Sequence, residues 1–141
     1  LAVEGCLRVL GETPKTSRYV YDADCGARLV PNYSGTQTDE GRALITTNSQ
    51  GFRDREHSIS KPAGVFRIAI LGDSFAEAAQ VDLEETFWAI LETKLVAENC
   101  FPEAIIEVLN FGVSGYGTAH VENGSEGIYA GPGAVMLSSG K

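Results

Sequence analysis

Residues 67–76 read Arg-Ile-Ala-Ile-Leu-Gly-Asp-Ser-Phe-Ala, an apolar, β-branched run that breaks at Gly-Asp-Ser. Such a run is typical of a strand buried on both faces of a parallel sheet. The break places Ser74 just past the end of the predicted strand, which is the edge where parallel sheets carry their ligand sites. We therefore take residues 66–71 as the first core strand and Ser74 as the first candidate for chemistry.

A second run of the same kind follows about forty residues later. Residues 105–111 read Ile-Ile-Glu-Val-Leu-Asn-Phe and lead into the small-residue loop 112–118, Gly-Val-Ser-Gly-Tyr-Gly-Thr. Two such strands with a helical stretch between them predict a βαβ unit with a site at its carboxyl edge. Residues 134–137 predict a third strand. Residues 119–133 stand where the next crossover helix belongs, but their glycines and Pro132 make a poor helix.

The intervening helix has a start signal and an apolar stripe. Asp82 can cap it, with Glu85 three residues later in capping-box register. The expected stripe toward the sheet follows helical spacing; its members are Phe87, Ile90, Leu91, Lys94 and Leu95. Trp88 lies beside this stripe, and we interpret it as a packing residue rather than a ligand platform.

The first part of the chain has short predicted strands and many turn formers in place of long apolar runs, so we divide the chain into residues 1–64 and 65–141. Short strands are predicted at 19–22, 28–31 and 43–47, separated by turn formers. This predicts a small, irregular β-rich lead-in packed against the main sheet. The chain begins at Leu1 and stops soon after the third strand, and we expect it to be part of a longer protein and marginally stable alone.

Composition limits the partners. A hydrophobic content of 43%, a charged content of 21% and a net charge of -8 indicate a globular protein that does not bind nucleic acid. No stretch approaches the roughly 18–20 apolar residues that span a bilayer, so a tether would need a segment upstream of Leu1. Cys6, Cys25 and Cys100 lack zinc-site spacing. A Cys6–Cys25 disulfide and buried free thiols both remain open.

Ser74 needs two kinds of partner to act as a nucleophile. A base must take its proton, and N–H donors must face the oxyanion that forms on the attacked carbonyl. Gly115 offers such an N–H with no side chain to obstruct a substrate. The structural alternative is that Ser74 caps the following turn and Gly115 only supplies a positive φ.

Five stretches of the chain resemble a bacterial branch of the SGNH/GDSL hydrolases. They are Asn-Ser-Gln-Gly-Phe-Arg-Asp (48–54), Lys-Pro-Ala-Gly-Val-Phe-Arg-Ile (61–68), Gly-Asp-Ser-Phe (72–75), Glu-Glu-Thr-Phe (84–87) and Asn-Phe-Gly-Val-Ser-Gly-Tyr-Gly-Thr (110–118). The resemblance implies a flavodoxin-like three-layer α/β fold with a parallel sheet, here truncated. It also implies that Ser74 is the nucleophile and an oxyanion donor, with Gly115 as the second donor, or Gly112 or Gly117 in another loop register. It implies no metal and no cofactor.

The same family needs two elements that this chain does not supply. In that family a Gly-x-Asn-Asp stretch begins at the position that Gly140 occupies here. An Asp-x-x-His near the C-terminus of the family's members provides the base. Asp54-Arg-Glu-His57 matches the second pattern in letters, but it precedes the nucleophile and we interpret it as a solvated turn. His120 is interpreted as a surface or helix-end residue. Asp73 is not paired with Ser74, because neighbours at a strand end point to opposite sides.

These observations predict a serine ester hydrolase, present as a fragment and itself inactive, that cleaves acyl or acetyl esters of small molecules or carbohydrates through an acyl-Ser74 intermediate. Two alternatives stay open: an O-acetyltransferase acting on an extracytoplasmic polysaccharide, and a non-catalytic module on the same scaffold. The resemblance alone suggests an extracytoplasmic or membrane-anchored setting.

Overall fold

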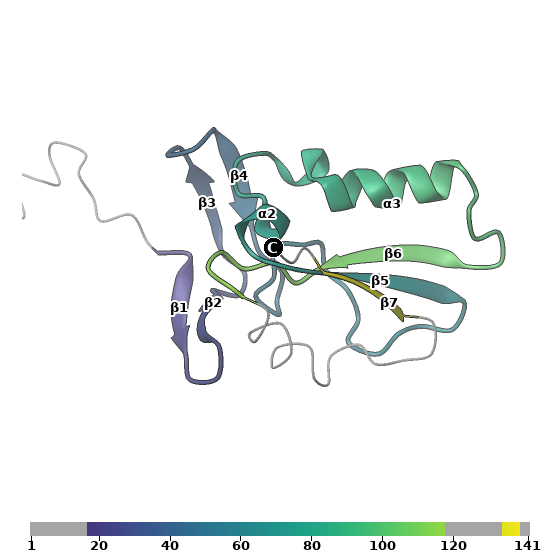
Figure 1. Cartoon of the computed structure of the whole chain (residues 1–141), viewed down its shortest axis with the longest axis horizontal. Coiled ribbons are helices and arrows are strands. Elements are labelled where there is room, and N and C mark those ends of the chain that lie inside the picture. The colour runs from purple at the N-terminus through teal and green to yellow at the C-terminus, as the bar shows by residue number, and fades with distance from the viewer. Residues whose placement is uncertain (1–16, 118–133, 139–141) are drawn as a thin grey trace, which may run out of the picture.

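The computed structural model describes residues 17–117 and 134–138. These residues form a mixed α/β structure around a parallel sheet (Figure 1). The elements in chain order are β1 (Tyr19–Asp22), β2 (Gly26–Leu29), β3 (Ser34–Gln37), β4 (Ala43–Thr46), β5 (Val65–Leu71), α2 (Ser74–Glu77), the 3₁₀ turn η1 (Leu83–Glu85), α3 (Phe87–Ala97), β6 (Ile105–Asn110) and β7 (Ala134–Ser138). No helix among them is long and apolar enough to cross a lipid bilayer.

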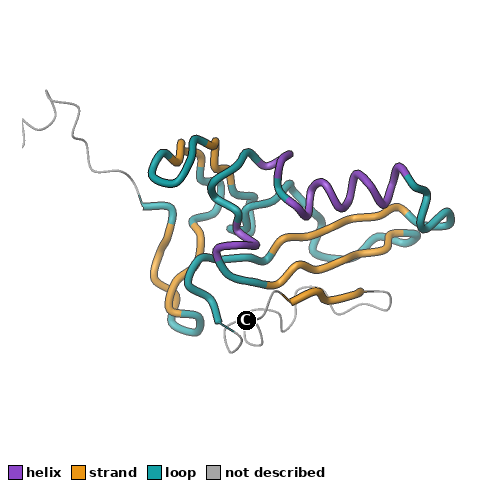
Figure 2. Tube along the Cα trace, turned by 45° about the horizontal axis from the view of Figure 1, so that its top comes forward, coloured by secondary structure: helices purple, strands orange, loops and turns teal. Residues whose placement is uncertain are grey.

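The parallel sheet has the strand order β6-β5-β7. Ile68 of β5 pairs with Val108 of β6 on one side and with Val135 of β7 on the other. In Figure 2 the three strands run side by side, with α3 along one face. The three predicted core strands are confirmed, with differences of a residue at their ends. The central position of β5 explains why it is apolar apart from Arg67, since both faces and both edges are covered.

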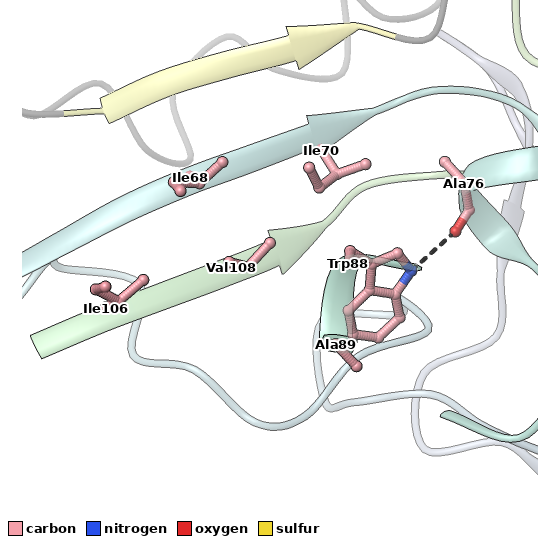
Figure 3. Packing of buried hydrophobic residues seen from close by; sticks show 7 residues of the cluster. All are labelled: Ile68, Ile70, Ala76, Trp88, Ala89, Ile106 and Val108. Carbon is pink, nitrogen blue, oxygen red and sulfur yellow. Dashed lines mark hydrogen bonds between the residues drawn. The ribbon is translucent and has the colours of Figure 1, made fainter. Parts of the chain in front are cut away.

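The face of the sheet toward α3 carries the larger apolar cluster (Figure 3). Its buried members are Ile68, Ile70, Ala76, Trp88, Ala89, Ile106 and Val108. The Trp88 side chain is completely buried, and its indole N–H donates to the carbonyl oxygen of Ala76 at 3.1 Å. This confirms Trp88 as a packing residue and fixes α3 against α2, the one-turn helix that begins at Ser74.

The predicted stripe on α3 is wrong in part, because Phe87 and Ile90 are 49% and 43% exposed. Asp82 and Glu85 do form a capping box, but it caps the start of η1 and not the start of α3. The N-cap of α3 is Thr86, whose hydroxyl accepts from the N–H of Ala89. The chain therefore enters the helix later than expected, and the face toward the sheet is the one that carries Trp88.

The opposite face of the sheet packs against the segment 48–59 of the lead-in. The Phe52 and Phe111 rings meet edge to face with centroids 4.8 Å apart. Arg67 of β5, almost fully buried, donates to a Glu107 carboxylate oxygen at 2.7 Å and to the carbonyl oxygen of Ser58 at 2.9 Å. The lead-in thus packs against the main sheet, as predicted.

Two carboxylates cover the outer edge of β6. Glu92 of α3 accepts the N–H of Val108 at 2.6 Å, and Asp54 accepts the N–H of Asn110 at 2.7 Å. A free row of N–H groups at a sheet edge is a template for pairing with other chains. The two acidic side chains occupy this edge, one from each side of the βαβ unit.

The lead-in contains two separate antiparallel hairpins, β1-β2 and β3-β4. The predicted strands at 19–22 and 43–47 are confirmed, with β4 ending at Thr46, whereas the one at 28–31 is shifted to Gly26–Leu29. The sequence did not predict β3 because Ser34 and Gly35 are turn formers. This strand forms only through its pairing with β4, in which Gly35 lies opposite Ile45.

Several sequence predictions fall on residues outside the described part of the chain. They concern Cys6, His120, the stretch 119–133 and the terminal residues 139–141. Of the other cysteines, Cys25 is a half-buried free thiol. Cys100 is also free but exposed, so the expectation of buried thiols is wrong for it.

Candidate functional site

The carboxyl end of β5 turns directly into α2, and Ser74 is the first residue of that helix. The Asp73 carboxylate accepts the N–H of Phe75 at 3.0 Å, so the N-cap is Asp73 and not Ser74. Ser74 is exposed, and neither its hydroxyl nor its N–H has a hydrogen-bond partner among residues 17–117 and 134–138. Its hydroxyl is therefore free to meet a molecule from solvent.

The loop after β6 is tied to the loop after β5. The N–H of Val113 donates to the carbonyl oxygen of Gly72 at 3.1 Å. Gly112 lies against α2 so closely that an added Cβ would stand 2.5 Å from the Cβ of Ala76 and 2.5 Å from the backbone nitrogen of Glu77. Only glycine fits here, and the absence of a side chain brings the two loops together.

The structure distinguishes two of the three glycines proposed as oxyanion donors, Gly112 and Gly115, and leaves Gly117 untested. The N–H of Gly112 is occupied, since it donates to the side-chain oxygen of Asn110 at 3.0 Å. Gly115 is exposed with φ +89, and its N–H has no partner among the described residues. An ideal Cβ on Gly115 would meet open space. Gly115 therefore keeps an available N–H beside the Ser74 loop, and Gly112 does not.

The Glu77 side chain connects the segment after β5, which contains Ser74, with the loop after β6, which contains Gly115. Its side chain is completely buried, and one carboxylate oxygen accepts the N–H of Ser114 at 2.7 Å. The other oxygen accepts from Arg18 at 3.0 Å and from the Tyr19 hydroxyl at 2.9 Å. A buried carboxylate needs such donors and an opposite charge. Glu77 thus links Ser74, three residues earlier, to the residue that precedes Gly115.

Arg53 supports the far end of α2. Its side chain is completely buried, and its guanidinium donates to the carbonyl oxygens of Glu77, Ala78 and Val81. Ala78 ends the helix in the left-handed region with φ 51. Burial lowers the pKa of Arg53, but a guanidinium stays protonated in proteins. The cation therefore binds the carbonyl groups at the C-terminal end of α2 and in the turn that follows it.

Replacing Gly112 with alanine is expected to destabilise the protein by about 1–3 kcal/mol, because the new methyl group would overlap α2. Urea unfolding followed by circular dichroism measures the loss. Ser60→Ala, at an exposed residue, is the control and should change stability by less than about 0.5 kcal/mol. Wild-type stability of the Gly112 variant would contradict the close packing of the two loops.

The interpretation of Asp54 to His57 as a solvated turn is wrong. Asp54 is 5% exposed because its carboxylate caps Asn110, and the His57 side chain is 10% exposed. The His57 ring nitrogens lie 3.5 Å from Asp54 and 3.8 Å from Glu107. Glu107 precedes Asn110 by three residues, which is about 10 Å back along the strand from the site edge. The structure therefore does not bring His57 to Ser74 as a base.

His57 gives the stability of the protein a defined pH dependence. The Asp54 carboxylate, 3.5 Å from Nε2, raises the pKa of His57 most; burial opposes this, and the charges of Glu107 and Glu92 add to the increase. A histidine whose pKa is higher in the folded protein than in the unfolded one stabilises the fold when it is protonated. This stabilisation is complete at pH values below the unfolded pKa of about 6.5. It is lost as the pH rises through the folded pKa.

The difference in unfolding free energy between wild type and His57→Gln should therefore shrink as the pH increases from 6 to 9. Urea titrations of both proteins across this range measure it. The difference cancels the titration of other groups, since both proteins share them. A difference that is constant or grows with pH would contradict the assignment of His57 as a paired cation.

Sequence reasoning missed Glu77 and Arg53, which hold the site together. Helical spacing gave no signal for Glu77, because a residue three positions after the exposed Ser74 is expected on the same exposed face, whereas Glu77 is completely buried. Arg53 had none, because its acceptors lie more than twenty residues further along the chain.

Comparison with protein-family models gives no match, and comparison with curated protein sequences gives none either.

Proposed function

We propose that this chain carries the nucleophile and part of the oxyanion hole of a serine ester hydrolase of the SGNH/GDSL type. The observation that carries the proposal is an exposed, unpartnered Ser74 hydroxyl at the end of the central strand, beside a loop whose Gly115 N–H is also free among the described residues. The strand order β6-β5-β7 supports the finer fold, because second-first-third is how a flavodoxin-like sheet begins.

In the proposed reaction the Ser74 oxygen attacks the ester carbonyl carbon, and the carbonyl oxygen gains the negative charge. The N–H groups of Ser74 and Gly115 donate to this oxyanion. The alcohol then leaves as the carbonyl re-forms, and water cleaves the acyl-Ser74 ester to release the acid. The proton of Ser74 goes to a base and from it to the leaving alcohol; in this proposal the base lies outside residues 17–117 and 134–138. Without that base most of the rate advantage is absent.

The test is covalent labelling of the 141-residue chain with a fluorophosphonate, read by mass spectrometry of the digested protein. A single adduct at Ser74 is expected, because its exposed hydroxyl is the proposed nucleophile. Ser74→Ala should abolish it, whereas Ser60→Ala, at another exposed serine, should leave it unchanged. Equal labelling of several serines, or no labelling of Ser74, would overturn the proposal.

A further inference from the structure

Two consecutive residues of the lead-in, Arg53 and Asp54, are bonded to the two halves of the proposed site. The Arg53 guanidinium donates to carbonyl oxygens at the end of α2, the helix that begins at Ser74. The Asp54 carboxylate accepts the N–H of Asn110 at 2.7 Å, where β6 passes into the loop that contains Gly115. Both side chains are buried, so the connection between the two halves runs through the interior of the protein.

Asn110 carries this connection into the loop after β6. Its side chain is buried, and its amide N–H₂ donates to the carbonyl oxygen of Arg53 at 3.0 Å. Its side-chain oxygen accepts the N–H of Gly112, also at 3.0 Å. Together with the Asp54 contact, three hydrogen bonds of one residue set the direction in which the chain leaves the strand.

In the loop itself, the bonded N–H groups leave one free donor at a defined place. The N–H groups of residues 111–114 and 116 all donate, and their acceptors are, in the same order, Ile70, Asn110, Gly72, Glu77 and Val113. The N–H of Gly115 lies within this run and has no partner among residues 17–117 and 134–138. A donor held in this way suits an oxyanion, because it does not have to reorganise during the reaction.

The turn that carries Arg53 and Asp54 is held by the side chain of Asn48. The Asn48 oxygen accepts the N–H of Gln50 at 3.1 Å and that of Phe52 at 2.9 Å. Its amide N–H₂ donates to the carbonyl oxygen of the residue after Asp54 at 3.1 Å. Buried hydrogen-bond networks rigidify the groups that they join, so the stretch 48–54 is suited to hold both halves of the site in place.

We propose that Asp54, acting through Asn110, is a positioning residue of the Ser74 site. With Arg53 it fixes where the Gly115 N–H lies relative to the Ser74 hydroxyl, although it is bonded to neither. This gives the stretch 48–54 a role in the site besides its packing against the sheet. The inference rests on the proposed function for its effect on Ser74, but its effect on the loop is measurable without any reaction.

The experiment compares Asp54→Ala with Ile106→Ala in the 141-residue chain. Asp54→Ala removes the acceptor of the Asn110 N–H and leaves every residue of the two halves unchanged. Ile106 is buried on the same strand, about 13 Å back from Asn110, so Ile106→Ala lowers stability through a cavity without touching this network. Urea unfolding of each variant defines conditions in which both proteins are folded, and the comparison is made there.

Two measurements report position rather than stability. The rate of fluorophosphonate labelling at Ser74 should fall about tenfold in Asp54→Ala and stay within about twofold of wild type in Ile106→Ala, because a displaced donor stabilises the developing charge less. Hydrogen exchange of the Val113 amide, which is bonded to Gly72, should accelerate in Asp54→Ala relative to the β5 amides, and should not do so in Ile106→Ala. Asp54→Asn keeps one oxygen for the Asn110 N–H and should restore part of both values.

Equal labelling rates in Asp54→Ala and Ile106→Ala, or equal protection of the Val113 amide in the two, would overturn the inference. Labelling of Ser74 that is unchanged by Asp54→Ala removes the positioning role and leaves the hydrolase. No labelling of Ser74 in wild type removes the hydrolase, and Val113 exchange then decides the positioning role alone. If Asp54→Ala does not fold, Asp54→Asn takes its place and must fall below Ile106→Ala in both measurements.

Discussion

Replacing Arg53 with methionine is expected to lower the free energy of unfolding by about 2–4 kcal/mol, because it removes the donor of several backbone carbonyl oxygens around the end of α2. Methionine fills most of the same volume, so the loss reports the hydrogen bonds rather than a cavity. The carbonyl oxygens of Glu77 and Val81 lose their donor together, and that of Ala78 keeps only the N–H of Val81 at 3.3 Å. Each buried acceptor without a donor costs about 1–3 kcal/mol. Urea unfolding followed by circular dichroism measures the sum.

The control for this variant is Arg42→Met, which removes the same charge from an exposed position and should change stability by less than about 0.5 kcal/mol. Arg53→Lys adds a second comparison, because a single ammonium cannot reproduce the planar fork that spans separate carbonyl oxygens. A loss from Arg53→Met no larger than that from Arg42→Met would show that α2 does not depend on this cation.

The part of the fold that the sequence predicts is the part governed by local apolar pattern. The runs 66–71 and 105–111 are buried on both faces, so composition alone identifies them as strands. The surface helix α3 shows where this approach ends. Its buried face depends on the residue at which the chain enters the helix, and the contact of Trp88 with Ala76 decides that. No pattern within residues 82–95 contains this information.

The candidate site likewise contains residues that the sequence predicts and residues that it does not. Ser74 is predictable because a small-residue break after a buried strand marks the edge where sites form. The choice between Gly112 and Gly115 is not predictable from the sequence, since both follow β6 in a glycine-rich loop. Only the structure shows that the Gly112 N–H is bound by Asn110. The burial of His57 was not predictable for a related reason: its surroundings are set by long-range packing against Glu107 of β6, 3.8 Å away, and not by the local sequence that suggested a solvated turn.

Replacing Glu77 with leucine is expected to destabilise the protein by about 3–5 kcal/mol, because it removes one partner of a buried ion pair and leaves the charge of Arg18 uncompensated. It also removes the acceptor of the Ser114 N–H and of the Tyr19 hydroxyl. Glu77→Gln should cost less, about 1–3 kcal/mol, since it keeps one oxygen but turns an amide N–H₂ toward groups that are themselves donors.

A second measurement separates the role of Glu77 in the site from its role in stability. Hydrogen exchange of the Ser114 amide, followed by NMR under native conditions, should accelerate in Glu77→Gln more than exchange of β5 amides does. The acceleration would be local because Ser114 N–H loses a carboxylate acceptor at 2.7 Å while the sheet keeps its hydrogen bonds. Glu84→Gln, exposed on η1, is the control and should leave both rates unchanged. If Ser114 stays as protected in Glu77→Gln as in wild type, Glu77 does not hold the Gly115 loop to α2, and the two halves of the proposed site are joined directly only through Gly72 and Val113.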